Sequence, residues 1–247
     1  MVVMESVIVE RNNVVEINNL SHSYGDKLIY DNLNISIHKG SVFGLLGKNG
    51  VGKSTLINIL MGYLKPKNGE CLIFGEPSHN LSRDSKKQIA LLHEGFISYD
   101  YMSIEQVEKF FEPFYSKWKK ELFYDLVDLM GLDYSQKLST LSFGQKSQVV
   151  LGCLFAQDAK LMILDDYSMG LDAGYRRLFT DYLKEYIKNT DKTVLITSHT
   201  MNDLENLIDD MAIIQKGGLV HLDTMKNFNA DKSTTFEDKF LDFVGKY

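Results

Sequence analysis

The sequence contains few of the residues that mark linkers, disulfide scaffolds and membrane spans. Its 247 residues include only three prolines and two cysteines, and there is no low-complexity tract. The scarcity of proline argues against long disordered linkers. Cys71 and Cys153 lie far apart in apolar stretches, which favours two buried free thiols in a reducing compartment over a disulfide. No apolar run approaches the roughly 20 residues that a membrane-spanning helix requires.

The N-terminal residues and the charge balance narrow the class of protein further. Residues 1–6 lack the basic start and the apolar stretch of a signal peptide. The formal net charge of −6 disfavours nonspecific binding to nucleic acid, so we expect no nucleic-acid partner, although this argument does not address a local basic patch. We therefore expect a soluble cytoplasmic protein that would meet a membrane only through a partner.

Hydrophobic patterning predicts strands that alternate with helices, and hence an α/β fold with a mostly parallel sheet. The early strands are expected to pair antiparallel, and a hairpin is expected around Gly217 and Gly218. We expect one domain over residues 1–247, with a helical insert over about 103–144 and a closing helix over about 236–244. The expected strands cover residues 14–20, 33–38, 41–46, 71–74, 88–92, 161–164, 193–196, 211–214 and 219–220.

Three further helices are expected from the same patterning. They cover residues 55–61, 145–156 and 175–187. Within the helical insert, Val107, Phe110, Phe111 and Phe114 are predicted to share one helical face.

A glycine-rich stretch is the most specific motif in the chain, because it fits the phosphate-binding pattern G-x-x-x-x-G-K-[ST] in full. An expected strand precedes it and an expected helix follows it, which is the context that the motif requires. Glycines let several backbone N–H groups point at phosphate oxygens, and the helix N-terminus adds partial positive charge. The stretch consists of Gly47, Lys48, Asn49, Gly50, Val51, Gly52, Lys53 and Ser54.

This loop predicts binding of a nucleoside triphosphate together with Mg²⁺. We expect Lys53 to reach the β- and γ-phosphates and the Ser54 hydroxyl to hold the metal ion. The alternative is a chance glycine turn, and the flanking strand and helix argue against it.

The phosphate loop alone is shared by a very large superfamily, and a second set of motifs restricts the choice among its families. Residues 141–145 read Leu-Ser-Phe-Gly-Gln ahead of a helix, and an apolar strand that leads into Asp165 and Asp166 begins sixteen residues after Gln145. With the phosphate loop, these motifs resemble those of the nucleotide-binding subunits of ABC transporters, and the resemblance extends from about residue 14 to residue 247. In that family the pentapeptide usually reads Leu-Ser-Gly-Gly-Gln, so Phe143 replaces the first glycine.

The resemblance implies a P-loop NTPase fold with a RecA-like core, an N-terminal antiparallel β-subdomain and an α-helical insert. It also implies that Ser142, Phe143, Gly144 and Gln145 bind the γ-phosphate of a nucleotide held by the opposite subunit of a dimer. A helix N-terminus with a free hydroxyl is a suitable anion site, whereas the alternative is an ordinary helix cap at Ser142.

Further roles follow from the same resemblance. Asp165 would hold Mg²⁺ at the end of its strand, and Asp172 belongs to the D-loop, which crosses the dimer interface. His199 would be the switch histidine, which hydrogen-bonds the γ-phosphate and the attacking water. Tyr24 would stack on adenine, although a lone tyrosine is more often a half-buried surface residue. Thr55 joins the phosphate loop in the expected ATP-binding set.

Besides Phe143, two segments of the chain depart from the family pattern. Asp166 and Tyr167 stand where Glu and Pro are usual, and the Glu is taken as the base that activates water. An Asp carboxylate stands back by about 1.5 Å, and a misplacement near 1 Å can reduce catalysis by about 10²-fold. Glu94 replaces a Gln that contacts Mg²⁺; a carboxylate suits the metal, and a solvated loop residue is the alternative.

The sequence favours an ATP-hydrolysing subunit that dimerises around ATP, with itself or with a paralogous subunit, and powers a separate integral membrane transport subunit. It would lie on the cytoplasmic face of the membrane. The loop at residues 95–102 is rich in aromatic side chains, which predicts a docking site for that partner. The alternatives are a soluble ABC-type assembly factor and an ATP switch that hardly hydrolyses.

Overall fold

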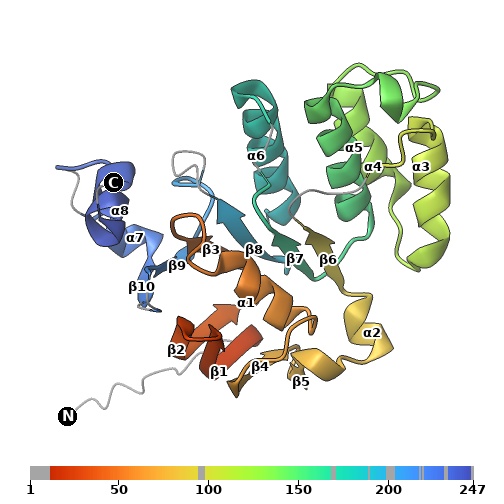
Figure 1. Ribbon diagram of the computed structural model, residues 1–247. Coiled ribbons are helices and arrows are strands. Elements are labelled where there is room, and N and C mark those ends of the chain that lie inside the picture. Colours follow the sequence, from red (N-terminus) through yellow and green to blue (C-terminus); the bar gives the residue numbers. More distant parts are fainter. Residues whose placement is uncertain are drawn as a thin grey trace, which may run out of the picture.

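Two β-sheets and a set of covering helices form the computed structural model of the chain (Figure 1). The structure describes residues 12–93, 98–167, 171–188, 190–198, 204–216, 218, 220–230 and 233–245.

The larger sheet has six strands in the order β10-β9-β3-β8-β7-β6. The five strands from β9 to β6 run parallel, and β10 adds an antiparallel edge. The central strands β3, β7 and β8 are wholly buried, as expected for a parallel sheet covered on both faces. The strands are β3 (Val42–Leu46), β6 (Ile89–Leu92), β7 (Leu161–Leu164), β8 (Thr193–Ser198), β9 (Asp210–Ile214) and β10 (Val220–Thr224).

The smaller sheet is antiparallel, in the order β2-β1-β4-β5, which confirms the expected pairing of the early strands. The strand expected over residues 71–74 begins earlier, at Asn68, as β4. Gly69 has a φ of 78°, and a Cβ there would lie 2.3 Å from the Asn19 carbonyl oxygen, so only glycine fits this strand crossing. The strands are β1 (Asn13–Tyr24), β2 (Lys27–His38), β4 (Asn68–Ile73) and β5 (Glu76–Pro77).

Eight α-helices and three short 3-10 helices lie in the described part of the chain. The closing helix predicted over residues 236–244 is observed with those bounds. The α-helices are α1 (Lys53–Leu60), α2 (Arg83–Lys86), α3 (Ile104–Phe111), α4 (Lys120–Leu129), α5 (Phe143–Ala156), α6 (Ala173–Ile187), α7 (Met225–Phe228) and α8 (Phe236–Val244); the 3-10 helices are η1 (Ser78–Asn80), η2 (Glu112–Phe114) and η3 (Leu138–Thr140).

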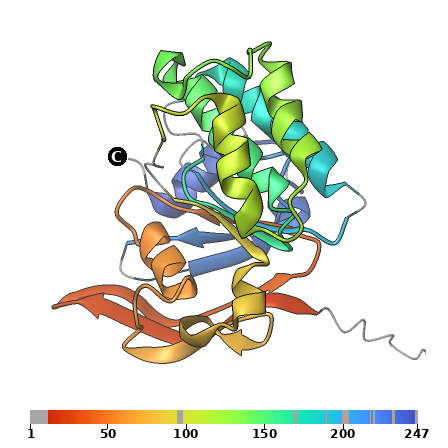
Figure 2. The same ribbon diagram turned by 90° about the vertical axis from the view of Figure 1, so that its right-hand side faces the viewer.

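The elements form layers around the six-stranded sheet. Helix α1 packs between the two sheets, where Leu56 and Leu60 share a buried cluster with Leu45 of β3 and Ile17 of β1. Helices α5, α6 and α8 cover the opposite face of the larger sheet. Figure 2 shows this order, with the red and orange antiparallel sheet below, the blue strands in the middle and the green and cyan helices above. Both expected free cysteines, Cys71 and Cys153, are buried and unpaired.

Helices α3 and α4 occupy the stretch predicted as a helical insert, although this division of the chain stays a prediction. They pack with α5 around a small core of their own that includes Val107 and Phe123. The predicted shared face is only partly formed, because α3 ends at Phe111 and Phe114 lies in η2. Phe110 and Phe114 are exposed, whereas Val107 is buried. Ile104 and Val107 are the residues of α3 that are buried in this core, whereas Phe111 packs against it partly buried.

Candidate nucleotide-binding site

The glycine-rich stretch forms a tight loop between β3 and α1, as the sequence predicts. Gly47 has a φ of 154°, and a Cβ there would lie 2.7 Å from the Ile214 carbonyl oxygen. Gly52 has a φ of 120°, and its Cβ would lie 2.6 Å from Ile29 and 2.9 Å from the Tyr30 hydroxyl. Any side chain at these positions would force the loop open, because both contacts are with packed strands.

Positive charge is concentrated inside this loop. The Lys53 ammonium group donates to the Gly47 carbonyl at 2.7 Å and to the Lys48 carbonyl at 3.1 Å, so it lies across the loop. No side chain caps the N-terminus of α1, where Gly52 is the capping residue, and no acidic residue lies in its first turn. The helix dipole therefore favours an anion at this N-terminus, and no acidic side chain of the first turn opposes it.

Two carboxylates lie at the carboxyl end of β7, opposite the loop. Asp165 is 2% exposed, and its Oδ1 accepts a hydrogen bond of 2.8 Å from the Thr197 hydroxyl. Its Oδ2 is buried and has no hydrogen-bond partner among the described residues. A buried carboxylate oxygen without a partner is costly unless a cation or donor completes it. Asp165 therefore fits a Mg²⁺ site, and Ser54 lines the same pocket.

Asp166 adopts a left-handed backbone conformation, with a φ of 48°. Aspartate tolerates this conformation better than most residues because its short side chain can hydrogen-bond locally. The following residue, Tyr167, is buried and packs on Phe179 with ring centroids 4.8 Å apart. Tyr167 thus anchors the chain in the core just beyond Asp166.

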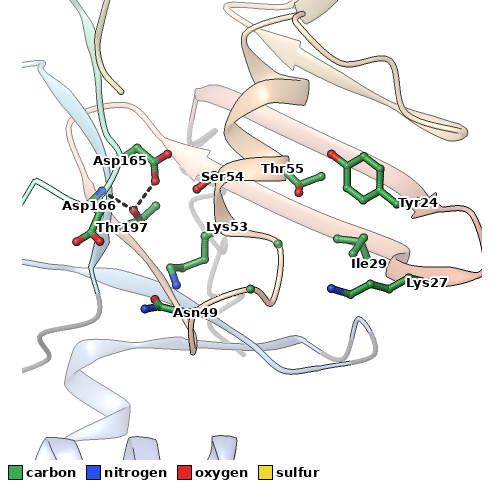
Figure 3. A pocket seen from close by; sticks show the side chains of 12 residues that line it. Tyr24, Lys27, Ile29, Asn49, Lys53, Ser54, Thr55, Asp165, Asp166 and Thr197 are labelled. Carbon is green, nitrogen blue, oxygen red and sulfur yellow. Dashed lines mark hydrogen bonds between the residues drawn. The ribbon is translucent and has the colours of Figure 1, made fainter. Parts of the chain in front are cut away.

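A pocket of about 350 Å³ joins these groups (Figure 3). In this view the two carboxylates lie at one end, Lys53 and Ser54 in the middle, and Tyr24 at the other end. Tyr24 is 51% exposed, so its ring is accessible to a planar ligand. The pocket is lined by Tyr24, Lys27, Ile29, Asn49, Gly50, Gly52, Lys53, Ser54, Thr55, Asp165, Asp166 and Thr197.

The buried side chain of His22 packs against Tyr24 on β1. The two rings meet edge to face with centroids 4.9 Å apart, and neither ring nitrogen of His22 has a hydrogen-bond partner among the described residues. Burial, and secondarily the charge of Lys67, lowers the pKa of His22. The Tyr24 ring therefore rests on a neutral imidazole.

The pentapeptide lies at the N-terminus of α5, away from this pocket. Ser142 and Gln145 form a capping box, in which the Ser142 hydroxyl accepts from the Gln145 N–H at 3.2 Å and the Gln145 side chain accepts from the Ser142 N–H at 2.9 Å. Phe143 is half exposed, and Gly144 packs against Tyr175 so closely that a Cβ would lie 2.7 Å from its ring. The cap predicted as the alternative is thus present, and no pentapeptide residue is among those that line the pocket.

Other expected site residues also lie outside the pocket. Asp172 caps α6 by accepting a 2.9 Å hydrogen bond from the Tyr175 N–H. The Lys48 ammonium group donates to the Gly245 carbonyl at 2.6 Å, and Val51 packs against the core beneath the loop. Glu94 and His199 lie outside the described residues.

Sequence reasoning missed Thr197, Lys27, Ile29 and Tyr30. The first three line the pocket, and the Tyr30 hydroxyl donates to the Gly52 carbonyl at 2.6 Å. A signal existed for Thr197, because it is a polar residue at the carboxyl end of a buried strand. The other three lie on β2, and no sequence pattern indicates that this strand packs beside the phosphate loop.

The comparisons with known proteins agree with this geometry. The pattern of the ABC transporter family matches residues 30–168. An uncharacterized ABC transporter ATP-binding protein, YhcH of Bacillus subtilis, is 31% identical over 225 residues, which are 90% of this chain and 74% of that protein. The Nod factor export ATP-binding protein I of Sinorhizobium fredii is 31% identical over 82% of this chain, which spans 60% of that protein.

Solved structures show the same fold. A structure described as the ATP-binding subunit of an ABC transporter superimposes with a TM-score of 0.78 at 20% identity, over 93% of this chain and 98% of that one. Among the described residues, no helix is long and apolar enough to cross a membrane. The family pattern and the relatives, together with a phosphate loop that faces a buried acidic strand end, show that the chain belongs to the ABC transporter family, among its ATP-binding proteins.

Proposed function

We propose that this chain binds Mg-ATP in the described pocket and hydrolyses it. The observation that carries the proposal is that one pocket brings together the Lys53 ammonium group, the uncapped N-terminus of α1 and the unpartnered Oδ2 of Asp165. Positive groups that face a carboxylate across a gap suit a triphosphate with a metal ion between them. The exposed ring of Tyr24 lies where an adenine would stack.

Each residue has a role in this proposal. Lys53 and the loop N–H groups bind the β- and γ-phosphates, while Ser54 and Asp165 hold Mg²⁺. When bound, Mg²⁺ neutralises phosphate charge. Asp166 accepts a proton from the attacking water, and His199 orients that water and the γ-phosphate. Glu94 is proposed as a further metal ligand; like His199, it lies outside the described residues.

We further propose that two subunits share each nucleotide. The phosphate loop and the pentapeptide of one chain do not meet at one pocket, so Ser142, Gly144 and Gln145 would complete the site of a second copy or a paralogue. Asp172, at the exposed N-terminus of α6, would lie at that interface.

The proposed output is movement in a membrane transport subunit, with this chain on the cytoplasmic face of the membrane. Relatives named for Nod factor export and bacitracin transport support a transport role. An exposed aromatic surface, formed by Tyr101, Phe110 and Phe114 around the half-buried Tyr99, provides a contact area for such a partner. The alternative of a soluble assembly factor lacks a comparable observation in its favour.

The Asp166→Asn variant tests the proposed hydrolysis. Loss of the general base should lower kcat by roughly 10²-fold or more while leaving ATP affinity within about twofold, because the loop still binds the phosphates. Asp191→Asn, at an exposed carboxylate that pairs with Lys39, is the matched control and should keep wild-type turnover. Unchanged turnover in Asp166→Asn would remove Asp166 from the mechanism. Failure of the wild type to bind ATP would overturn the proposed function itself.

A slow ATP switch is the second candidate, and the left-handed backbone at Asp166 is the observation that favours it. A strained position and a shorter carboxylate both restrict where the base can lie. Single-turnover measurement with the wild type distinguishes the two: hydrolysis over hours in a saturated ATP dimer indicates a switch, whereas turnover within seconds to minutes indicates an active ATPase.

A further inference from the structure

Thr197 connects Asp165 and Asp166 through one hydroxyl group, which bonds the carboxylate of Asp165 and the backbone N–H of Asp166. It is the fifth residue of β8, beside the end of β7, and it is wholly buried. Its Oγ1 donates to Asp165 Oδ1 at 2.8 Å and accepts from the Asp166 N–H at 2.8 Å (Figure 3). The parallel register, in which Leu164 pairs with Ile196, brings these residues side by side.

From this geometry we propose that Thr197 is a positioning residue for Asp165 and Asp166. Its hydroxyl group determines which carboxylate oxygen of Asp165 is left for Mg²⁺, and it fixes the backbone of Asp166. The inference rests on the proposed function, because it assigns a role within the same site.

The direction of the hydroxyl proton follows from its partners. A backbone N–H can only donate, so the Thr197 oxygen must accept from Asp166. The single hydroxyl proton is then left for Asp165, where it occupies Oδ1. Oδ2 remains without a partner among the described residues and lies beside the pocket. Thr197 thus prepares one defined carboxylate oxygen for the metal ion and prevents the carboxylate from turning.

The second bond acts on the proposed base. Asp166 holds a φ of 48°, a conformation that non-glycine residues seldom adopt without support. The bond from its N–H to Thr197 fixes the peptide at this point, and the buried ring of Tyr167 fixes the next residue. Because a misplacement near 1 Å can reduce catalysis by about 10²-fold, this bond would matter most in a site that uses the shorter Asp.

A purely structural role would be simpler: the hydroxyl would only satisfy two buried polar groups. Such a role predicts lower thermal stability in a variant, with no change specific to Mg²⁺. A positioning role predicts that the gain in ATP affinity caused by Mg²⁺ is reduced, while ATP affinity in EDTA is not. These predictions differ in a binding measurement that requires no turnover.

The test compares Thr197→Val with Thr197→Ser in the full chain. Thr193→Val is the matched control, because Thr193 is also a buried threonine of β8 but its hydroxyl accepts from the Gly40 N–H at 3.0 Å, away from the pocket. ATP affinity is measured by calorimetry with Mg²⁺ and with EDTA, together with kcat and the unfolding temperature.

Thr197→Val should reduce the Mg²⁺-dependent gain in affinity by about fivefold, as expected for one lost hydrogen bond, and reduce kcat by at least about tenfold. Thr197→Ser keeps the hydroxyl and should stay within about twofold of wild type. Thr193→Val should affect only the unfolding temperature. The ratio of ATP affinity with Mg²⁺ to ATP affinity in EDTA should stay unchanged.

Wild-type values of both the affinity ratio and kcat in Thr197→Val would overturn the inference and leave a structural role. Thr197→Ala, which leaves room for a water molecule, decides the question by the same criteria if the Val variant does not fold. Absence of Mg-ATP binding by the wild-type chain would instead refute the proposed function, and the inference with it.

Discussion

Tyr30 holds the phosphate loop from outside its motif. Its hydroxyl is buried, donates to the Gly52 carbonyl at 2.6 Å, and fills the space that a Cβ at Gly52 would need. Burial raises the pKa of Tyr30 well above its ordinary value, so the hydroxyl stays protonated and remains a donor. The shape of the loop therefore depends on β2 as well as on its own glycines.

Removal of this hydroxyl should loosen the loop. Tyr30→Phe keeps the ring and loses one hydrogen bond of about 1 kcal/mol, so ATP affinity should fall by about three- to tenfold. Tyr182→Phe is the control, since it also removes a hydroxyl that bonds to Asp125, far along the chain from the loop. Calorimetric titration of both variants checks the expectation. Equal ATP affinity in wild type and Tyr30→Phe would show that the glycines maintain the loop without the Tyr30 hydroxyl group.

His22 predicts a dependence of stability on pH. Its pKa is lowered from 6.5 in the folded state, so the unfolded chain takes up a proton first as the pH falls. The contribution of neutral His22 to the free energy of unfolding is therefore fully present above pH 6.5, and it is lost as the pH falls below this value. His22→Phe retains a ring against Tyr24 and should show a shallower loss of unfolding temperature between pH 7.5 and 5.5. Parallel curves for the two proteins would contradict this assignment.

At the scale of elements, the site is formed by the carboxyl ends of strands and the N-terminus of a helix. The carboxyl ends of β3, β7 and β8 meet at one edge of the sheet and supply the phosphate loop, Asp165 and Thr197. The N-terminus of α1 faces the pocket, whereas the N-terminus of α5 does not. The first N–H groups of a helix have no intrahelical partner, and for this reason anions bind at helix N-termini.

The separate position of α5 leads to a prediction about dimerisation. Ser142→Arg should prevent formation of an ATP-dependent dimer, because a bulky side chain would occupy the place of the partner's nucleotide, yet ATP binding by the monomer should stay within about twofold. Light scattering in the Asp166→Asn background with Mg-ATP, and with ADP as the reference, measures this. Ser116→Arg places the same side chain at another exposed serine as a control.

Dimer formation by the Ser142→Arg variant would contradict the proposal that Ser142 completes the nucleotide site of a second subunit. A monomer at high protein concentration in the Asp166→Asn protein itself, with Mg-ATP present, would contradict dimerisation altogether.

At the scale of the whole molecule, the exposed aromatic surface lies on the helical layer rather than at the pocket. Tyr99 contacts Phe110 and Phe111, and Tyr101 stands 70% exposed beside them. Asp100 between the two tyrosines accepts from Lys146 at 2.9 and 3.0 Å, one residue beyond the pentapeptide. A partner that moves this surface would thus act directly on α5.

Tyr101→Ala should reduce co-purification with a membrane transport subunit and leave the basal turnover of the isolated chain unchanged, because the side chain does not reach the pocket. Tyr63→Ala, at another highly exposed tyrosine, is the control. Loss of basal turnover with normal docking in Tyr101→Ala would show that the surface supports the fold of the chain instead. Phe96, which the sequence also suggests for docking, lies outside the described residues.

The sequence by itself determined the phosphate loop, the buried parallel strands and the closing helix. These features are local: glycine spacing, unbroken apolar runs and helical periodicity act within a few residues of one another. The family resemblance, rather than periodicity, assigned adenine stacking to Tyr24 and Mg²⁺ binding to Asp165; both residues line the pocket, and these roles stay predictions. The roles of His199 and Glu94 stay predictions.

Only the tertiary structure decided which residues meet. Thr197 reaches Asp165 through the register of two strands separated by more than twenty residues, and Tyr30 reaches Gly52 because β2 packs under the loop. The exposure of Phe110 and Phe114 likewise depends on which side chains pack into the small core with α4 and α5. A sequence pattern records which residues can be buried or bonded, whereas packing of distant segments determines which of them are.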